Sequence, residues 1–199
     1  MQNEKKQNNR WTSTRTLAEN AILIAVATVL SLFAVFKLPN GGSVTIGSMI
    51  PIILLSIKYP LRWSLTAAFA YSLIQMLSGF FAPPVENILY YTIMILLDYI
   101  IAFCVLCLSG PIYRKISSRM SARFSIITAA IICFILRFIS HFLSGIIIWG
   151  YYASEGQPVW LYSLLYNGSY MICECLISGT ILYFAGQRLV ALMCSNNSV

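Results

Sequence analysis

Long apolar stretches separated by short polar segments dominate the chain. Six such stretches can be marked, covering roughly residues 17–36, 46–58, 61–80, 88–109, 124–149 and 160–185. A helix rises about 1.5 Å per residue, so about 20 residues are needed to cross about 30 Å of hydrocarbon. Five of the six stretches reach that length. The pattern therefore predicts an all-α integral membrane protein with six transmembrane helices.

The second stretch, 46–58, is too short to cross a membrane alone. Pro51 and Pro60 flank it, and proline both removes a backbone donor and bends a helix. Such a segment is tolerated at membrane depth only where protein shields it from lipid. We therefore expect a kinked or partly re-entrant helix that its neighbours enclose.

The composition excludes an ordinary soluble domain. Hydrophobic residues make up 59% of the chain and charged residues 10%, with a mean hydropathy of +0.78. A soluble domain of this length needs a more charged surface. The net charge of +7 is compatible with nucleic-acid binding by itself, but the positions of the charges favour another explanation.

The basic residues follow the topology of a membrane protein. With the N-terminus placed in the cytoplasm, Lys37 falls outside and Arg137 falls within a helix. The other eleven of the thirteen basic residues then lie on the cytoplasmic side: Lys5, Lys6, Arg10, Arg15, Lys58, Arg62, Arg114, Lys115, Arg119, Arg123 and Arg188. This asymmetry predicts that both termini are cytoplasmic. We expect a lipid bilayer as the environment and no nucleic acid as a partner.

The chain divides into one membrane domain with two polar ends. We expect a flexible cytoplasmic segment over 1–16, a single six-helix domain over 17–190 and a cytoplasmic tail over 191–199. The first apolar stretch is too long for a cleavable signal peptide. Cys104 and Cys107 form a C-x-x-C without a second pair at zinc-like spacing, so we interpret the cysteines as small buried residues and predict no metal.

Four ionisable residues fall deep within the predicted helices: Asp98, Arg137, His141 and Glu174. Such residues are costly in a membrane and usually face the bundle interior, where they mark functional sites. Asp98 and Arg137 are predicted at similar depth, so one alternative is a structural ion pair between them with His141 in the core. We interpret Glu174 as structural or as a contact with a partner subunit.

A polar stripe on the fifth helix favours a binding site. Arg137, His141, Gly145 and Trp149 recur every fourth residue, which places them on one face about 120° wide. Gly145 is expected to leave room for a flat group between imidazole and indole. A tryptophan near a helix end is also typical of a membrane interface, and Asn167 in the sixth helix is also explained by helix–helix hydrogen bonding.

Together these residues predict a pocket that opens outward. Asp98 supplies a negative charge, Trp149 an aromatic face that attracts cations, and Asn167 two donors and an acceptor. This chemistry suits a small, flat, cationic ligand.

Several motifs resemble one family over nearly the whole chain. They are LAENAILIAVATVLS (17–31), IGSMIPIILLSIKYP (46–60), LLDYIIAF (96–103), RFISHFLSGIIIWGYYA (137–153) and PVWLYSLLYNGSYM (158–171). The chain is similar to the thiamine-specific S components of energy-coupling factor transporters. The H-x-x-x-G-x-x-x-W pattern in the fifth helix carries most of the likeness, because it is not a general membrane pattern.

The resemblance implies a function, a location and partners. It implies a multi-pass protein of the bacterial plasma membrane that captures thiamine with high affinity and catalyses no reaction. It also implies assembly with a membrane T subunit and two ATPase subunits. The thiamine contacts carried over by position are Asp98, Tyr99, His141, Gly145, Trp149, Tyr162 and Asn167. Ala21 and Ala25 match the A-x-x-x-A motif that packs against the T subunit.

Two departures from the family pattern affect the predicted pocket. The family usually has glutamate where this chain has Asp98, which is one methylene shorter. The family also can carry a tryptophan in the first outer loop, which covers the site. Here the loop KLPNGGSVT (37–45) has none, and Phe36 is the nearest aromatic residue.

Other functions have less support in the sequence. An S component for riboflavin or a pyridoxine-like vitamin keeps the architecture, but a neutral ligand leaves the charge of Asp98 unanswered unless Arg137 pairs with it. An intramembrane enzyme lacks an H-E-x-x-H motif or a second nearby carboxylate, and a channel lacks a filter motif. The chain has no G-x-x-x-x-G-K-[ST] motif, so any ATP-driven transport requires partner subunits.

Overall fold

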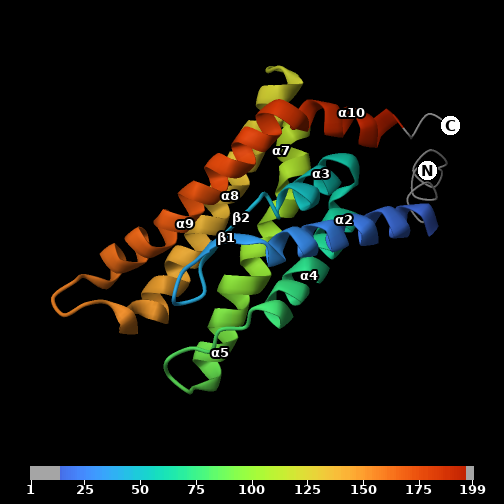
Figure 1. Ribbon diagram of the computed structural model, residues 1–199. Helices are drawn as coiled ribbons and strands as arrows, with labels where there is room; N and C mark the ends of the chain where they lie inside the picture. The colour runs from blue at the N-terminus through green and yellow to red at the C-terminus, as the bar shows by residue number, and fades with distance from the viewer. Residues whose placement is uncertain (1–13, 196–199) are drawn as a thin grey trace.

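The structure is a computed structural model that describes residues 14–195. Helices make up most of it. The fourth predicted helix is built from several segments. The other helices are α2 (Thr14–Leu32), α3 (Ile50–Lys58), α4 (Leu61–Ser78), α8 (Ala122–Ile147), α9 (Val159–Ile181) and α10 (Gln187–Ser195). Helices α8 and α9 run side by side along the molecule, while the start of α2 and the end of α10 lie at one end (Figure 1).

The short second helix is enclosed by protein, as its length predicts. Every residue from Ile50 to Ile57 in α3 is buried, and the helix packs against α2, α4 and α7 (Ser109–Ile116). Pro51 lies in the first turn, where a missing backbone donor costs nothing. The predicted kink within this helix is therefore wrong. The side chains of Lys58 and Tyr59 bind Glu19 of α2 and fasten the end of α3 to it.

The fourth helix is continuous but not regular. It runs from Ile88 to Ile116 and changes its hydrogen-bond pattern several times: α5 (Ile88–Met94), the π-helix η1 (Ile95–Ile101), α6 (Ala102–Cys104), the 3-10 helix η2 (Val105–Leu108) and α7. Such π segments widen a helix and are frequent at functional sites. Here the π segment contains both Asp98 and Tyr99.

The first helix is shorter than predicted, because a β-hairpin follows it. Helix α2 ends at Leu32, and strand β1 (Ala34–Lys37) pairs antiparallel with β2 (Ser43–Thr45). Valine and phenylalanine in β1 favour an extended backbone, and Pro39-Asn40-Gly41 provides the turn. Because residues 33–36 are apolar, the hydropathy pattern did not reveal this change from helix to strand.

Helices α2 and α10 extend into the two predicted polar ends. Residues 14–16 belong to α2, and residues 191–195 belong to α10, which continues α9 through the π-helix η4 (Leu182–Gly186). The rest of both predicted ends, residues 1–13 and 196–199, lies outside the described part of the chain.

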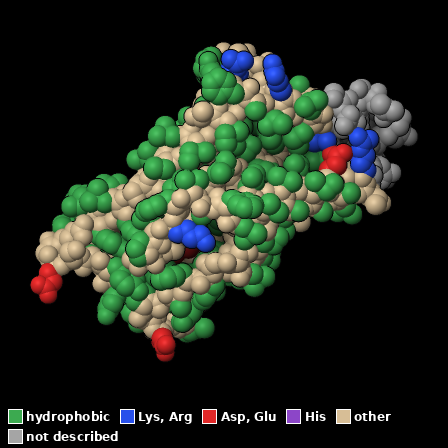
Figure 2. Space-filling view, in the orientation of Figure 1, with side chains coloured by type: hydrophobic (Ala, Val, Ile, Leu, Met, Phe, Trp, Pro, Cys, Tyr) green, Lys and Arg blue, Asp and Glu red, His purple; other side chains and the backbone are tan. Residues whose placement is uncertain are grey.

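Four described helices are long and apolar enough to cross a membrane: Thr14–Leu32, Ile88–Ile116, Ala122–Ile147 and Val159–Met193. Helix α4 is of nearly that length but carries Arg62 and Gln75. Figure 2 shows hydrophobic side chains over most of one face. Lys and Arg lie mainly toward the end where α2 begins and α10 ends, with a further basic side chain near the middle of the face. Acidic side chains mark loops at the opposite end of this face.

Candidate functional site

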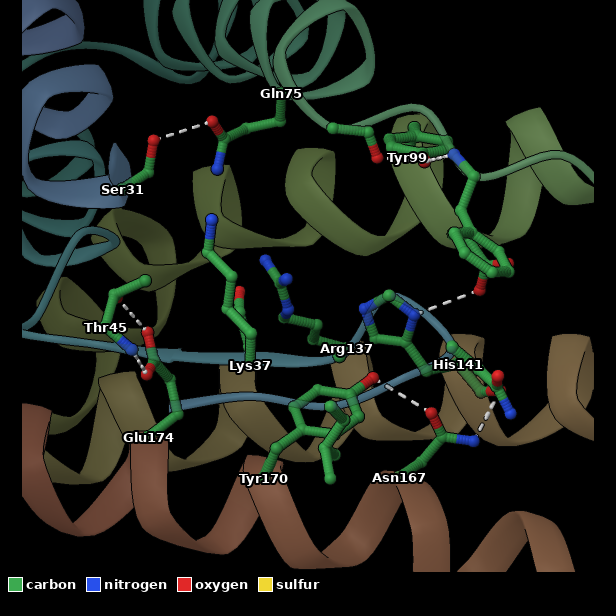
Figure 3. A pocket seen from close by; sticks show the side chains of 18 of the residues that line it. Ser31, Lys37, Thr45, Gln75, Tyr99, Arg137, His141, Asn167, Tyr170 and Glu174 are labelled. Atoms are coloured by element: carbon green, nitrogen blue, oxygen red, sulfur yellow. Dashed lines mark hydrogen bonds and ion pairs between the residues drawn. The ribbon is translucent and has the colours of Figure 1, made fainter. Parts of the chain in front are cut away.

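A cavity of about 440 Å³ lies under the β1–β2 hairpin. Its walls come from the hairpin, the loop after α4, the π-helix η1, and the facing sides of α8 and α9. Six of the seven predicted ligand residues line it: Asp98, Tyr99, His141, Trp149, Tyr162 and Asn167. Figure 3 shows the polar side chains turned into this space from opposite walls.

Asp98 is the centre of a hydrogen-bond network. Its Oδ1 lies 3.0 Å from His141 Nδ1, and its Oδ2 accepts from Ser144 Oγ at 2.6 Å and from Trp149 Nε1 at 2.8 Å. The Asp98 side chain is 14% exposed, so its charge sits in a poorly solvated place where electrostatic interactions are strong. Arg137 forms no ion pair with any described residue, so the alternative Asp98–Arg137 pair is not formed.

His141 presents one free nitrogen. With Asp98 ionised and the imidazole neutral, the bond to Asp98 assigns the proton to Nδ1 and leaves Nε2 as an acceptor. Nε2 is buried and has no partner among the described residues. A ligand that donates a hydrogen bond inside the cavity can satisfy it.

Trp149 lies just beyond α8, at the start of the 3-10 helix η3 (Trp149–Tyr152). Its bond to Asp98 fixes the indole, which stacks on Tyr152 with ring centroids 6.3 Å apart. Phe81, from the loop after α4, packs against it at 5.5 Å. The indole therefore faces the cavity rather than serving only as a membrane-interface residue. Phe81 could not be predicted from the sequence, because contacts between distant loops leave no periodic signal.

Phe36, the aromatic residue nearest to the first outer loop, does not cover the site. Phe36 is 58% exposed and does not line the cavity. Phe81 approaches Trp149 instead, so the covering aromatic group comes from a different loop.

Asn167 and Gly145 hold α8 and α9 together. Asn167 Nδ2 donates to the carbonyl of His141 at 3.2 Å, and its Oδ1 accepts from Tyr170 at 2.9 Å. A side chain at Gly145 would overlap Ser163 and Asn167. The interpretation that Gly145 leaves room for a flat ligand is therefore wrong: α9 fills that space, and Gly145 does not line the cavity.

Tyr99 positions the loop after α4. Its hydroxyl donates to the carbonyl of Gly79 at 2.9 Å and accepts from the backbone N–H of Phe81 at 3.2 Å. Its ring also stacks on Phe80 with centroids 6.2 Å apart. Tyr99 thereby positions Phe81, which packs against Trp149.

The hairpin is held over the cavity by α9. Tyr162 accepts from Asn40 Nδ2 at 3.2 Å, and Tyr166 accepts from the backbone N–H of Asn40 at 3.1 Å. At the other end of the hairpin, the backbone N–H and hydroxyl of Thr45 donate to Glu174. Glu174 is 1% exposed, so its observed role is structural, and no contact with a partner subunit is open to it.

The helix-one alanines lie on the outside. Ala21 and Ala25 are exposed, on the same face of α2 as Ile22 and Val29, which are 62% and 52% exposed. Cys104 and Cys107 are free thiols inside the fourth helix. Within the described residues no cluster of three His, Cys, Asp or Glu side chains is placed to hold a metal ion.

Comparisons with known proteins agree on one family. Residues 17–193 match the family described as Thiamine transporter protein (Thia_YuaJ). The chain is 33% identical over 187 residues to Thiamine transporter ThiT of Bacillus subtilis (strain 168), covering 87% of this chain and 93% of that protein. It is 27% identical over 190 residues to Thiamine transporter ThiT of Lacticaseibacillus paracasei, covering 88% and 90%.

A solved structure has the same fold. The structure described as native-SAD phasing for ThiT from Listeria monocytogenes superposes with a TM-score of 0.69 at 24% identity. The match covers 87% of this chain and 96% of that chain. The expected six-helix S-component architecture therefore fits the chain.

Proposed function

The chain belongs to the thiamine transporter protein family, and from that premise we propose that it captures thiamine in the cavity beneath the hairpin. As a member of this family it is a substrate-binding S component for thiamine uptake and not an enzyme. Its place is the bacterial plasma membrane, which its apolar helices cross several times.

The Asp98 network is the observation that supports the site. Thiamine carries a permanently charged thiazolium ring, and a carboxylate with low exposure attracts such a cation strongly. Asp98 also orients the indole of Trp149, whose face adds a cation–π attraction of about 2 kcal/mol when water is excluded. A neutral vitamin gains nothing from either term.

The remaining contacts suit the aminopyrimidine ring. His141 Nε2 is an unpartnered acceptor for an exocyclic amine, and Tyr162 and Asn167 border the same space. Tyr99 acts through the loop that carries Phe81. Gly145 acts through the contact between α8 and α9 and not by touching the vitamin.

Titration calorimetry of the full-length protein in detergent tests this function. Thiamine is expected to bind saturably at sub-micromolar concentration, whereas riboflavin and pyridoxine give no heat of binding at the same concentrations. Binding of riboflavin or pyridoxine without thiamine binding would move the chain to the alternative class of vitamin.

Energy for uptake is assigned to partner subunits. An S component of an energy-coupling factor transporter works with a membrane T subunit and two ATPases, and the exposed face of α2 around Ala21 and Ala25 is the proposed contact with the T subunit. Small residues let helices approach closely.

Ala21→Trp with Ala25→Trp should abolish co-purification with the T subunit and leave thiamine affinity unchanged. Co-purification at the wild-type level would refute this contact.

The orientation in the membrane follows from charge. The basic residues of the α7–α8 turn and of α10 belong on the cytoplasmic side, which places both termini there and opens the cavity outward. The proposed membrane domain stays 17–190, and α10 continues beyond it to Ser195.

A further inference from the structure

Two serine side chains of α8 donate to another helix rather than to their own. Hydroxyl groups in helices commonly bond back to a carbonyl three or four residues earlier, as those of Thr28, Ser72 and Thr180 do here. Ser140 and Ser144 donate to the fourth helix instead. They are 3% and 0% exposed, so both bonds form away from water, where they hold the two helices in one register.

The two bonds end on consecutive residues of the π-helix η1. Ser140 Oγ donates to the backbone carbonyl of Leu97 at 2.6 Å, and Ser144 Oγ donates to Oδ2 of Asp98 at 2.6 Å. The two serines are one turn apart, which places their side chains on the same face of α8. A π segment interrupts the regular hydrogen-bond pattern of a helix, so an outside donor to one of its carbonyls helps to hold it. One serine therefore fixes the backbone just before Asp98, and the other fixes the carboxylate itself.

The carboxylate of Asp98 has little acceptor capacity left for a ligand. A carboxylate offers about four lone-pair sites, and donors from His141, Ser144 and Trp149 occupy three of them. Both sites on Oδ2 are taken by Ser144 and Trp149, so the remaining site is on Oδ1. Because a single site is open, a small rotation of the carboxylate changes what the cavity offers to a cation.

We propose that Ser140 and Ser144 are positioning residues for vitamin binding, which hold Asp98 so that its remaining acceptor site serves the ligand. Neither serine lines the cavity, whereas Asp98 does, so both act through Asp98 rather than by touching the vitamin. Side chains that are held in place before binding lose little freedom when the ligand arrives, which raises affinity. The proposal rests on thiamine capture in the same cavity and names the residues that set its anionic contact.

Ser144→Ala tests the direct contact. Without one of its three donors the carboxylate can turn, so the dissociation constant for thiamine should rise about 3- to 10-fold in titration calorimetry of the full-length protein in detergent. Ser144→Cys should lose affinity to a similar degree, because a thiol fills the space but donates only weakly. Ser125→Ala is the control, since this buried serine of α8 bonds only to the carbonyl of Met120, at 3.4 Å.

Three calorimetric results would overturn the positioning role. They are wild-type affinity in Ser144→Ala, wild-type affinity in Ser144→Cys, which would assign the effect to packing, and an equal loss in Ser125→Ala. If Ser144→Ala does not fold, Ser144→Cys carries the same comparison.

A double-mutant cycle tests whether both serines act through Asp98. Ser140→Ala should also weaken thiamine binding, because the carbonyl of Leu97 loses its outside donor. Once the side chain of Asp98 is removed by Asp98→Ala, Ser140→Ala and Ser144→Ala should each change the affinity less than twofold. Losses of equal size with and without the Asp98 side chain would show a general packing role and contradict the proposal.

The fluorescence of the ligand-free protein gives a test that does not need thiamine. Trp149 shares Oδ2 of Asp98 with Ser144, so a turned carboxylate changes the surroundings of the indole. Ser144→Ala should shift the emission maximum relative to wild type, and the shift should vanish when both proteins also carry Trp149→Phe. An unshifted maximum would overturn the proposal. Failure of wild type to bind thiamine would instead defeat the proposed function, while the emission comparison still decides the role of Ser144.

Discussion

Asp98 does two things at once in the cavity wall. It carries the negative charge, and it fixes the imidazole of His141 and the indole of Trp149 through direct hydrogen bonds. The shorter aspartate reaches these groups from the widened π segment of the fourth helix. The position of the carboxylate thus depends on the backbone geometry around it as well as on side-chain length.

The charge of Asp98 can be tested by Asp98→Asn, which also replaces one of the two oxygens that accept from His141, Ser144 and Trp149. Asp98→Asn should raise the dissociation constant for thiamine about 10- to 100-fold, since the attraction to the thiazolium ring is lost in a poorly solvated place. Titration calorimetry measures it, with Glu86→Gln, an exposed carboxylate in the α4–α5 loop, as the control. An unchanged constant together with a lower melting temperature would make Asp98 a purely structural residue.

Gly145 is predicted to matter for stability. In Gly145→Ala the new methyl group overlaps Ser163 and Asn167, and forcing the helices apart should cost about 1–3 kcal/mol. The change should lower the melting temperature in detergent. Gly179→Ala on α9 is the matched control, because no atom lies within 4 Å of its new methyl group. Equal melting temperatures for the two variants would contradict the packing role.

The polar stripe of the fifth helix predicted much of the site. Costly polar residues in apolar helices identified Asp98, His141 and Trp149, all of which line the cavity. The same stripe gave a wrong interpretation of Gly145. Helical spacing predicts the face on which a residue lies, but not which residues pack against that face. Ser144, which binds Asp98, was missed because serine is common in membrane helices and carries no charge.

At the scale of elements, the hairpin was the feature that hydropathy could not reveal. Strand β1 is mostly apolar like the helix before it, and the Pro39-Asn40-Gly41 turn marked the change. Its attachment to α9 is firm at Thr45 and weaker at Asn40. This difference suggests that the tip of the hairpin opens while its base stays in place.

The tip attachment is expected to limit the rate of thiamine release. Tyr166 accepts from the backbone N–H groups of both Asn40 and Gly42. Tyr166→Phe removes that acceptor and should speed thiamine dissociation about 3- to 10-fold, since each bond contributes about 1 kcal/mol. Stopped-flow fluorescence measures the rate, with Tyr183→Phe on η4, outside the cavity lining, as the control. Equal rates in both variants would exclude the attachment as a gate.

The second and fourth helices show how far element lengths could be predicted. The enclosure of α3 followed from its length alone. The π and 3-10 segments of the fourth helix did not, because they depend on tertiary contacts such as the bond from Ser140 Oγ to the carbonyl of Leu97 at 2.6 Å. Local sequence carries little information about such bonds.

At the scale of the whole molecule, basic and acidic loop residues lie at opposite ends of the long helices. The exposed Arg114, Lys115 and Arg119 surround the α7–α8 turn, whereas Glu155 lies in the α8–α9 loop at the other end of α8. The number of apolar segments predicted the architecture, because the bilayer thickness fixes helix length. The order in which helices pack could not be predicted that way.

The orientation can be measured in cells. Ser154→Cys, in the α8–α9 loop, should react with a membrane-impermeant maleimide added outside, whereas Ser118→Cys, in the α7–α8 turn, should react only after permeabilisation. Labelling is compared with wild type, which shows the background of the native cysteines. Labelling of Ser118→Cys in intact cells, without labelling of Ser154→Cys, would invert the topology.

The most direct test asks whether thiamine binds against Trp149. The chain has four tryptophans, and that of residue 149 lies in the cavity wall, bonded to Asp98. Thiamine should quench wild-type fluorescence saturably at sub-micromolar concentration. In Trp149→Phe the quenching should be almost absent, although calorimetry still detects weaker binding. Full quenching in Trp149→Phe, with wild-type affinity, would place the vitamin elsewhere and contradict the site.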